Sequence, residues 1–309
     1  MTESQTTSHV LMIRPVRFAG NVQTAASNRF QQLDGAVADA QAAALNEFDA
    51  LANALRANDV DVHIVDDTPE PHTPDSIFPN NWVSFHADGT VVLYPMLAAN
   101  RRLERRLDIV EALDLHDGFH VSRTVDLTHR EAEGKFLEGT GSLVLDRINR
   151  IAYACLSPRT DMDVLGEFAQ RLDYDIVAFE AFDAGGEPIY HTNVLMSVGA
   201  RCVAICSASI EPQRRAAVME TLAKSGREVI DLSMEQMNSF AGNMLELQSR
   251  SGTPVLAMSE AARTVLDSDQ RAKLEAHAKI VSVPIPTIER LGGGSVRCMI
   301  AEVHLPRRK

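Results

Sequence analysis

The strongest constraint on the fold is one order of elements that recurs five times along the chain. Each unit has two short runs rich in β-branched residues, then an amphipathic or alanine-rich segment, then another apolar run. Short runs of this kind predict strands and the longer segments predict helices, so each unit is predicted to be β-β-α-β. Four units are contiguous and occupy 81–125, 142–179, 193–232 and 243–283, with their helices over 101–113, 161–172, 211–224 and 259–278.

The fifth unit is divided between the two ends of the chain. Residues 296–305 supply one hairpin strand and 10–15 the other, followed by a helix over 36–57 and a strand over 60–65. Because both ends share this unit, the five units are expected to close into a ring. We therefore expect one α/β domain over residues 1–309, with residues 1–8 disordered.

Composition narrows the class of partner. A chain of 309 residues with 45% hydrophobic content can bury a large core, and its formal charge of −12 argues against a nucleic-acid or anionic-membrane surface. The expected partner is a small molecule. A polar N-terminus and the lack of eighteen uninterrupted apolar residues predict a cytoplasmic protein with reduced cysteines. The sequence leaves a homodimer open.

Polar residues recur at one place in the repeat, just before or at the start of each first strand. In chain order they are Asp75 with Asn80 and Asn81, Glu138, His191 with Asn193, Asn243, and Cys298. Residues that occupy the same place in every unit of a ring converge on its axis, so these side chains are expected to meet there. Taken singly, each has an ordinary structural explanation as a turn, loop or strand-edge residue. Their shared position favours a common site.

The last of these residues follows three consecutive glycines, Gly292 to Gly294. Glycine permits positive φ and close backbone approach, so such a run can place the Cys298 thiol precisely. The alternative is a tight turn into a strand that carries a buried cysteine. A thiol, an imidazole and two carboxylates together form a set for covalent catalysis, in which a thiolate attacks and a histidine moves protons.

These residues resemble the guanidino-group-modifying enzymes of the pentein fold, which include arginine deiminases, dimethylarginine dimethylaminohydrolases and amidinotransferases. The similar segments are Asp75-Ser76-Ile77-Phe78, Leu137-Glu138-Gly139, Ser157-Pro158-Arg159-Thr160, His191-Thr192-Asn193 and Gly292 to Met299. The resemblance implies an α/β fold, a five-bladed propeller of ββαβ units around a pseudo-fivefold axis.

The same resemblance implies roles for the matching residues. Cys298 would form a covalent adduct at the central carbon of a guanidino or ureido group, and His191 would protonate the leaving amine and then activate water. Glu138 would orient the histidine, Asp75 would hold a substrate nitrogen, and Arg159 would pair with the substrate carboxylate. We further expect Cys298 and His191 to form an ion pair.

Two departures from the family pattern point to the substrate. Where arginine deiminases carry Phe-x-Arg-Asp, the chain has Phe78-Pro79-Asn80-Asn81, and where they carry His-x-Asp it ends in Asn193. The acidic-glycine loop also departs, with Thr140-Gly141 in place of Gly-Asp. A buried guanidinium calls for anions, whereas an amide satisfies a neutral ureido group. The resemblance is therefore closest to citrulline utilization hydrolases, and we predict hydrolysis of L-citrulline to L-ornithine, carbon dioxide and ammonia.

Several alternatives stay open at this point. Asp75 and Glu138 would also suit arginine or a methylated arginine, and a transferase would use the same thiol adduct as a hydrolase. A non-catalytic, ribosome-associated pentein should lack the cysteine and histidine, which are present here. A metal enzyme could use His63, His72 and His86, or His116 and His120, but no convincing zinc spacing appears. We expect neither a metal nor a cofactor, and expect Phe78, Asn80, Asn81, Asn193 and Asn243 to help bind substrate.

Overall fold

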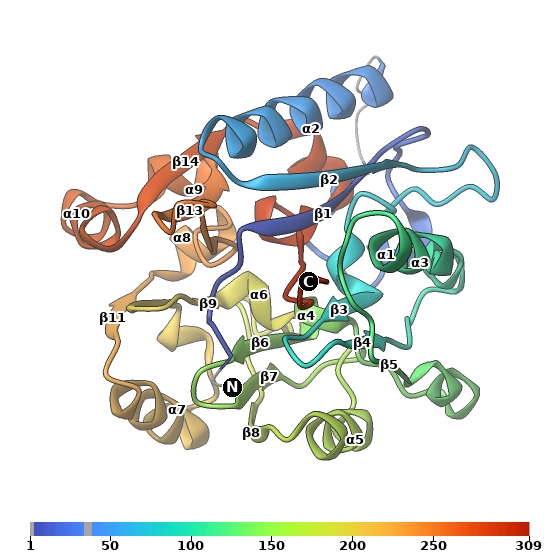
Figure 1. The fold of residues 1–309 in the computed structure, drawn as a ribbon. Helices are drawn as coiled ribbons and strands as arrows, with labels where there is room; N and C mark the ends of the chain where they lie inside the picture. The colour runs from blue at the N-terminus through green and yellow to red at the C-terminus, as the bar shows by residue number, and fades with distance from the viewer. Residues whose placement is uncertain (1–2, 34–38, 309) are drawn as a thin grey trace.

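Five three-stranded sheets form the ring in the computed structural model, which describes residues 3–33 and 39–308 (Figure 1). In every sheet the middle strand pairs antiparallel with one neighbour and parallel with the other. The predicted α/β five-bladed propeller of ββαβ units is confirmed.

The blades follow the chain in order. Their strands are β3 (Val83–Phe85), β4 (Thr90–Leu93) and β5 (Arg123–Asp126); β6 (Leu143–Asp146), β7 (Ile151–Cys155) and β8 (Asp175–Phe179); β9 (Met196–Val198), β10 (Cys202–Ile205) and β11 (Glu228–Asp231); β12 (Leu245–Gln248), β13 (Pro254–Ser259) and β14 (Lys279–Val283); and β15 (Ala301–Glu302), β1 (His9–Arg14) and β2 (Asp61–Asp66).

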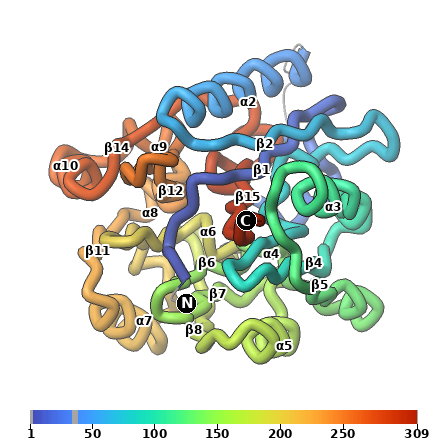
Figure 2. Tube along the Cα trace, viewed as in Figure 1, coloured from blue at the N-terminus to red at the C-terminus, as the bar shows by residue number. Residues whose placement is uncertain are grey.

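A parallel strand pair needs a crossover connection, and helices on the outside of the ring supply it (Figure 2). The crossover helices are α2 (Ala40–Ala57), α3 (Leu107–Leu115), α5 (Met162–Leu172), α7 (Pro212–Lys224), and the pair α9 (Glu260–Val265) and α10 (Ser268–His277). In α5 the Asp161 carboxylate caps the first turn, and Val164, Phe168 and Leu172 bury one face. Burial of each such side chain contributes about 1.5–3 kcal/mol.

The last blade joins the two ends of the chain. Strand β1 pairs antiparallel with β15, with Val10 opposite Glu302, and parallel with β2. The β15 strand covers only Ala301 and Glu302 of the predicted 296–305, because Val296–Met299 form a 3₁₀ turn. The predicted helix over 36–57 is α2 from Ala40, and 36–38 fall in the gap between the described residues.

Two predicted helices differ from the structure. The predicted helix over 259–278 is two helices, because Leu266 is extended and Asp267 starts α10 with a capping box that includes Gln270. The predicted helix over 101–113 is a 3₁₀ segment, Ala99–Glu104, followed by α3, with extended backbone at Arg105 and Arg106 between them.

Residues 3–8 are ordered, which differs from the disorder expected for residues 1–8. Gln5, Thr6 and Thr7 are buried, and the Gln5 side-chain amide donates to the carbonyls of Leu145 and Val198 at 2.9 and 3.0 Å. This stretch crosses two blades and satisfies their carbonyls, which a disordered tail could not do. Residues 1–2 lie outside the described residues. No helix in the described part of the chain is long and apolar enough to cross a membrane.

Candidate active site

Short helical turns lie before the first strands of four of the five units, and they line the middle of the ring. They are a 3₁₀ turn (Pro79–Asn81), α4 (Gly139–Ser142), α6 (Thr192–Leu195) and a second 3₁₀ turn (Val296–Met299). Glu138 and His191 occupy the N-cap positions of α4 and α6, and Cys298 lies within the last turn. The recurrent polar positions of the repeat therefore converge in space, as the sequence predicts.

Cys298 is buried in contact with two amides. The side-chain amide nitrogens of Asn193 and Asn243 lie 3.4 and 3.3 Å from its Sγ. The glycine run before it is closely packed, since a Cβ on Gly294 would lie 3.1 Å from the ring of Phe78, and Gly293 has a φ of 63°. The run therefore holds the cysteine loop against Phe78.

His191 is held by Glu138. Its Nε2 lies 2.9 Å from Glu138 Oε2, which leaves Nδ1 as the nitrogen for proton transfer. Burial lowers the pKa of His191 to about 4, against the opposing effect of the hydrogen bond to Glu138. Burial alone would raise the pKa of Glu138, but the Arg159 guanidinium and His191 hold it well below its usual range. The lowered pKa of His191 disfavours the charged imidazole that the expected Cys298–His191 ion pair requires.

Two buried arginines complete the electrostatics. Arg159 Nη1 lies 3.3 Å from Glu138 Oε2. Arg101 donates twice to Glu104, at 2.9 Å each, and donates to Asn81 Oδ1 at 2.9 Å. Its Nε also lies 3.7 Å from Asp75 Oδ2, while Asp75 Oδ1 is buried with no hydrogen-bond partner. The acids of this region are thus paired with arginines, and one oxygen of Asp75 stays free to accept from a ligand.

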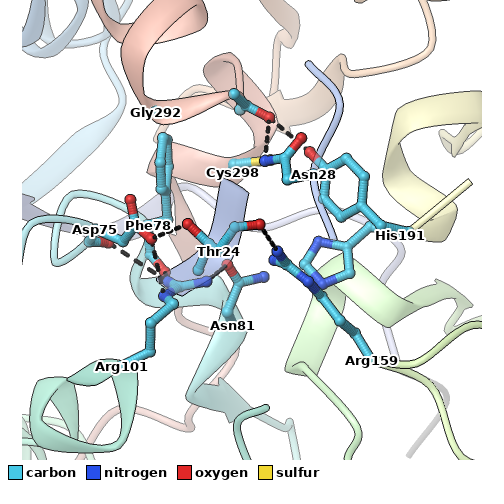
Figure 3. Close-up of a pocket in the computed structure, with 13 residues that line it drawn as sticks. Thr24, Asn28, Asp75, Phe78, Asn81, Arg101, Arg159, His191, Gly292 and Cys298 are labelled. Carbon is cyan, nitrogen blue, oxygen red and sulfur yellow. Dashed lines mark hydrogen bonds and ion pairs between the residues drawn. The ribbon is translucent and has the colours of Figure 1, made fainter. Parts of the chain in front are cut away.

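These side chains surround a small closed pocket, whose lining residues Figure 3 shows pointing toward one another. Its cavity volume is about 10 Å³, room for roughly one water molecule. The segment after β1 covers it. Asn28 donates to the carbonyl of Gly293 at 3.0 Å, and Arg159 donates to the carbonyl of Thr24 at 3.1 Å. A cavity of this volume is smaller than an amino acid.

The structure gathers most of the predicted site residues. Cys298, His191, Asp75, Phe78, Asn81 and Arg159 line the pocket. Glu138, Asn193 and Asn243 are not among the lining residues, but each contacts His191 or Cys298. Asn80 does not line the pocket, although it is buried and both polar atoms of its side chain lack a partner.

Sequence reasoning missed four lining residues: Thr24, Asn28, Arg101 and Tyr190. Thr24 and Asn28 lie in the long segment between the strand at 10–15 and the helix at 36–57, which the repeat leaves unassigned. That length was a usable signal of an insertion over the ring. Arg101 falls inside a predicted helix and carried no signal. Among the described residues, neither the trio His63, His72 and His86 nor the pair His116 and His120 forms a group that could hold a metal.

Comparison with known proteins agrees with this geometry. The model of the family described as N,N dimethylarginine dimethylhydrolase, eukaryotic, matches residues 14–305. No curated protein sequence matches the chain.

Solved structures share the fold at low identity. The N-terminal domain of ArgZ, an arginine dihydrolase of the cyanobacterial ornithine–ammonia cycle, was solved bound to product; it is 17% identical with a TM-score of 0.74, over 97% of this chain and 99% of that one. DDAH from Pseudomonas aeruginosa, complexed with citrulline, is 16% identical with a TM-score of 0.64, over 96% and 99%. The chain spans 41% of the longer ArgZ chain. At these identities the likeness establishes the fold.

Proposed function

The chain belongs to the family described as N,N dimethylarginine dimethylhydrolase, eukaryotic, and within it we propose that this enzyme hydrolyses the ureido group of L-citrulline to give L-ornithine, carbon dioxide and ammonia. Membership makes it a cysteine-dependent hydrolase of non-peptide C–N bonds in arginine-related substrates. Hydrolysis is thereby confirmed over amidino transfer, and the alternative of a non-catalytic, ribosome-associated protein is wrong. Family membership gives the class of substrate, and the proposal adds that the specific substrate is citrulline.

The observation that carries the proposal is the pair of amides at the nucleophile. Asn193 and Asn243 both direct side-chain N–H groups at Cys298 Sγ, so amides instead of carboxylates surround the reacting sulfur. Asn193 Oδ1 is buried with no hydrogen-bond partner. A ureido NH₂ donates one hydrogen bond to such an oxygen and carries no charge that would require an anion.

The arginines of the pocket also favour a substrate with a neutral head group. Glu138 is already paired with Arg159 and with His191, and Glu104 is paired with Arg101. A guanidinium brought into this pocket would meet two buried cations, Arg101 and Arg159. Among the described lining residues the one carboxylate is Asp75, whose Oδ2 already faces Arg101, and burial of an undercompensated charge is costly. The neutral ureido group of citrulline avoids this penalty.

The charged end of the amino acid has partners of its own. The free oxygen of Asp75 suits the α-ammonium group, and the guanidinium groups of Arg159 and Arg101 suit the α-carboxylate. Each group of the substrate would then meet an opposite charge, or a neutral hydrogen-bonding partner where it carries no charge.

The reaction needs two covalent steps. Neutral His191 accepts the Cys298 proton at Nδ1, and the thiolate attacks the ureido carbon to form a C–S bond. The imidazolium, stabilised by Glu138, returns the proton to the leaving nitrogen as its C–N bond breaks. His191 then activates water, which displaces the sulfur and gives a carbamic acid. Loss of carbon dioxide from that acid frees the second amine, so that one water is consumed overall.

A head-to-head assay tests the substrate. Citrulline, arginine and dimethylarginine are compared at equal concentration, with ammonia, dimethylamine, citrulline and ornithine quantified. We expect the highest kcat/KM for citrulline, with one ammonia per ornithine. A preference for arginine or dimethylarginine would overturn the role given to the amides, while leaving the hydrolase itself in place.

Arginine is the second candidate, favoured by the fold shared with an arginine dihydrolase. For arginine, the free oxygen of Asp75 would hold a guanidinium nitrogen instead of the α-ammonium group. The same thiol would first hydrolyse arginine to citrulline and ammonia and then hydrolyse the ureido group. Two ammonia molecules per ornithine from arginine, at a rate equal to that from citrulline, would support this second route.

A further inference from the structure

A second group of ligand-type side chains lies on the sheet that joins the chain ends. Strands β1 and β2 run side by side there (Figure 1), and their parallel pairing sets His9 opposite Asp61. His63 follows Asp61 by two residues, so both side chains point to the same face of β2. The parallel register thus brings two histidines and one carboxylate together from positions 52 and 54 residues apart.

The distances suit a small cation. His9 Nδ1 lies 3.0 Å from Asp61 Oδ2, and His63 Nε2 lies 3.7 Å from the same oxygen. One ligand atom from each residue lies within 4.8 Å of the other two. Tetrahedral zinc with bonds of about 2.0–2.2 Å requires ligand atoms about 3.3–3.6 Å apart, so small side-chain rotations would suffice.

The residues packed around the two imidazole rings also resemble those around a metal site. Asp117 Oδ2 lies 3.5 Å from Nδ1 of His63, the ring nitrogen that faces away from Asp61, and His63 Nε2 is buried with no hydrogen-bond partner. A carboxylate on the second nitrogen of a ligating histidine is the usual way to orient the ring toward a metal. The ring of Phe119 packs edge-on against both imidazoles, with centroids 5.3 and 5.4 Å away.

The neighbouring charges are mixed. The Arg307 guanidinium lies over the same Phe119 ring at 4.6 Å, and its charge opposes a cation nearby. Two carboxylates, Asp61 and Asp117, have the opposite charge and favour a cation.

We propose that His9, Asp61 and His63 bind one divalent zinc ion, with water as the fourth ligand. Imidazole nitrogen and carboxylate oxygen are ligands that zinc prefers, and the three side chains are partly exposed, which leaves an entry path. The ion would connect β1 to β2 in the sheet that closes the ring. Because it binds only the folded chain, it would raise the melting temperature.

Calorimetric titration of Zn²⁺ into the full chain tests this proposal. The active-site thiol is a competing zinc ligand, so the titration is run on Cys298→Ser protein, and stability is followed by thermal melting with and without Zn²⁺. We expect one zinc per chain and a higher melting temperature. His63→Gln should abolish both effects, and Asp117→Asn should weaken binding by about 10- to 100-fold. His129→Gln, at an exposed histidine outside the group, is the matched control and should leave binding unchanged.

Two results would overturn the site. One is the absence of zinc binding by Cys298→Ser protein. The other is a zinc affinity in the His63→Gln and Asp117→Asn variants that equals the affinity of the Cys298→Ser parent. If His63→Gln fails to fold, the exposed Asp117→Asn substitution still decides the question. No step of this test depends on the substrate of the hydrolase.

Discussion

Glu138 Oε2 lies 2.9 Å from Nε2 of His191, and both side chains are almost wholly buried. This contact fixes which imidazole nitrogen faces the pocket, and it places a negative charge where an imidazolium forms during the reaction. Since Arg159 also pairs with the same oxygen, the carboxylate connects His191 to the arginine that we propose binds the substrate carboxylate.

Replacement of this carboxylate tests its role. Glu138→Gln keeps the shape but removes the charge that stabilises the imidazolium, so we expect kcat to fall by about 10²- to 10⁴-fold. Steady-state kinetics with citrulline measure this. The exposed carboxylate of Glu187, four residues before His191, gives the matched control Glu187→Gln, which should leave kcat unchanged. Equal kcat values in the two variants would contradict the role of Glu138.

The buried imidazole also predicts a pH dependence. Because burial lowers the pKa of His191 to about 4, the acid limb of kcat/KM should have its midpoint near 4 instead of near the ordinary histidine value of 6.5.

The same pKa difference affects stability. Between pH 4 and pH 6.5, His191 binds a proton in the unfolded chain but not in the folded chain. The contribution of this group to stability is therefore lost as the pH falls through the window from 6.5 to 4. An acid limb centred at 6.5 would rule out a neutral, buried His191.

Substrate preference should respond to charge beside the thiol. Asn193→Asp replaces a donor 3.4 Å from Cys298 Sγ with an anion that suits a guanidinium. A hydrogen bond to a charged group contributes about 1.5–3 kcal/mol, so the ratio of kcat/KM for arginine over citrulline should rise by about 10- to 100-fold. Asn193→Ser, the uncharged control, should lower both activities without changing their ratio. An unchanged ratio in Asn193→Asp would show that the amide does not select the head group.

Gly141 tests the packing behind His191. A Cβ at this position would lie 2.6 Å from His191 Nδ1 and would also collide with the Asn81 amide. Gly141→Ala should therefore displace the imidazole and lower kcat by about 100-fold. In the helix α5, Gly166 has nothing within 4 Å of an added Cβ, so Gly166→Ala should keep full activity and gain about 0.8–1.0 kcal/mol of stability. If Gly141→Ala retains wild-type kcat, His191 is not held in this position during catalysis.

Local pattern predicted the blades but not the details of the turns. The unit predicted over 142–179 contains β6, β7 and β8 and ends where β8 ends, because short apolar runs between turn residues leave few alternatives. The break between α9 and α10 was visible in the Asp267-x-x-Gln270 capping pair, yet the helical periodicity around it dominated the prediction. The turn that holds Cys298 was predicted as strand, since its apolar residues do not reveal the 3₁₀ geometry.

Long-range contacts lay beyond the sequence. Repeat position alone placed Glu138, His191 and Cys298 on the axis, because equivalent residues of a ring must meet there. Arg101 reaches the pocket through a 3₁₀ segment outside that pattern. The pairing of His9 with Asp61 depends on the register of two strands 52 residues apart, and nothing local to either strand specifies it.

The most direct test is mass spectrometry of the enzyme quenched during a single turnover of citrulline labelled with ¹³C at the ureido carbon. The account predicts a labelled, transient adduct on the peptide that contains Cys298, formed and lost at rates that match ornithine release, with no adduct and no turnover in Cys298→Ala. Full turnover by Cys298→Ala, or an adduct that forms from arginine but not from citrulline, would contradict it.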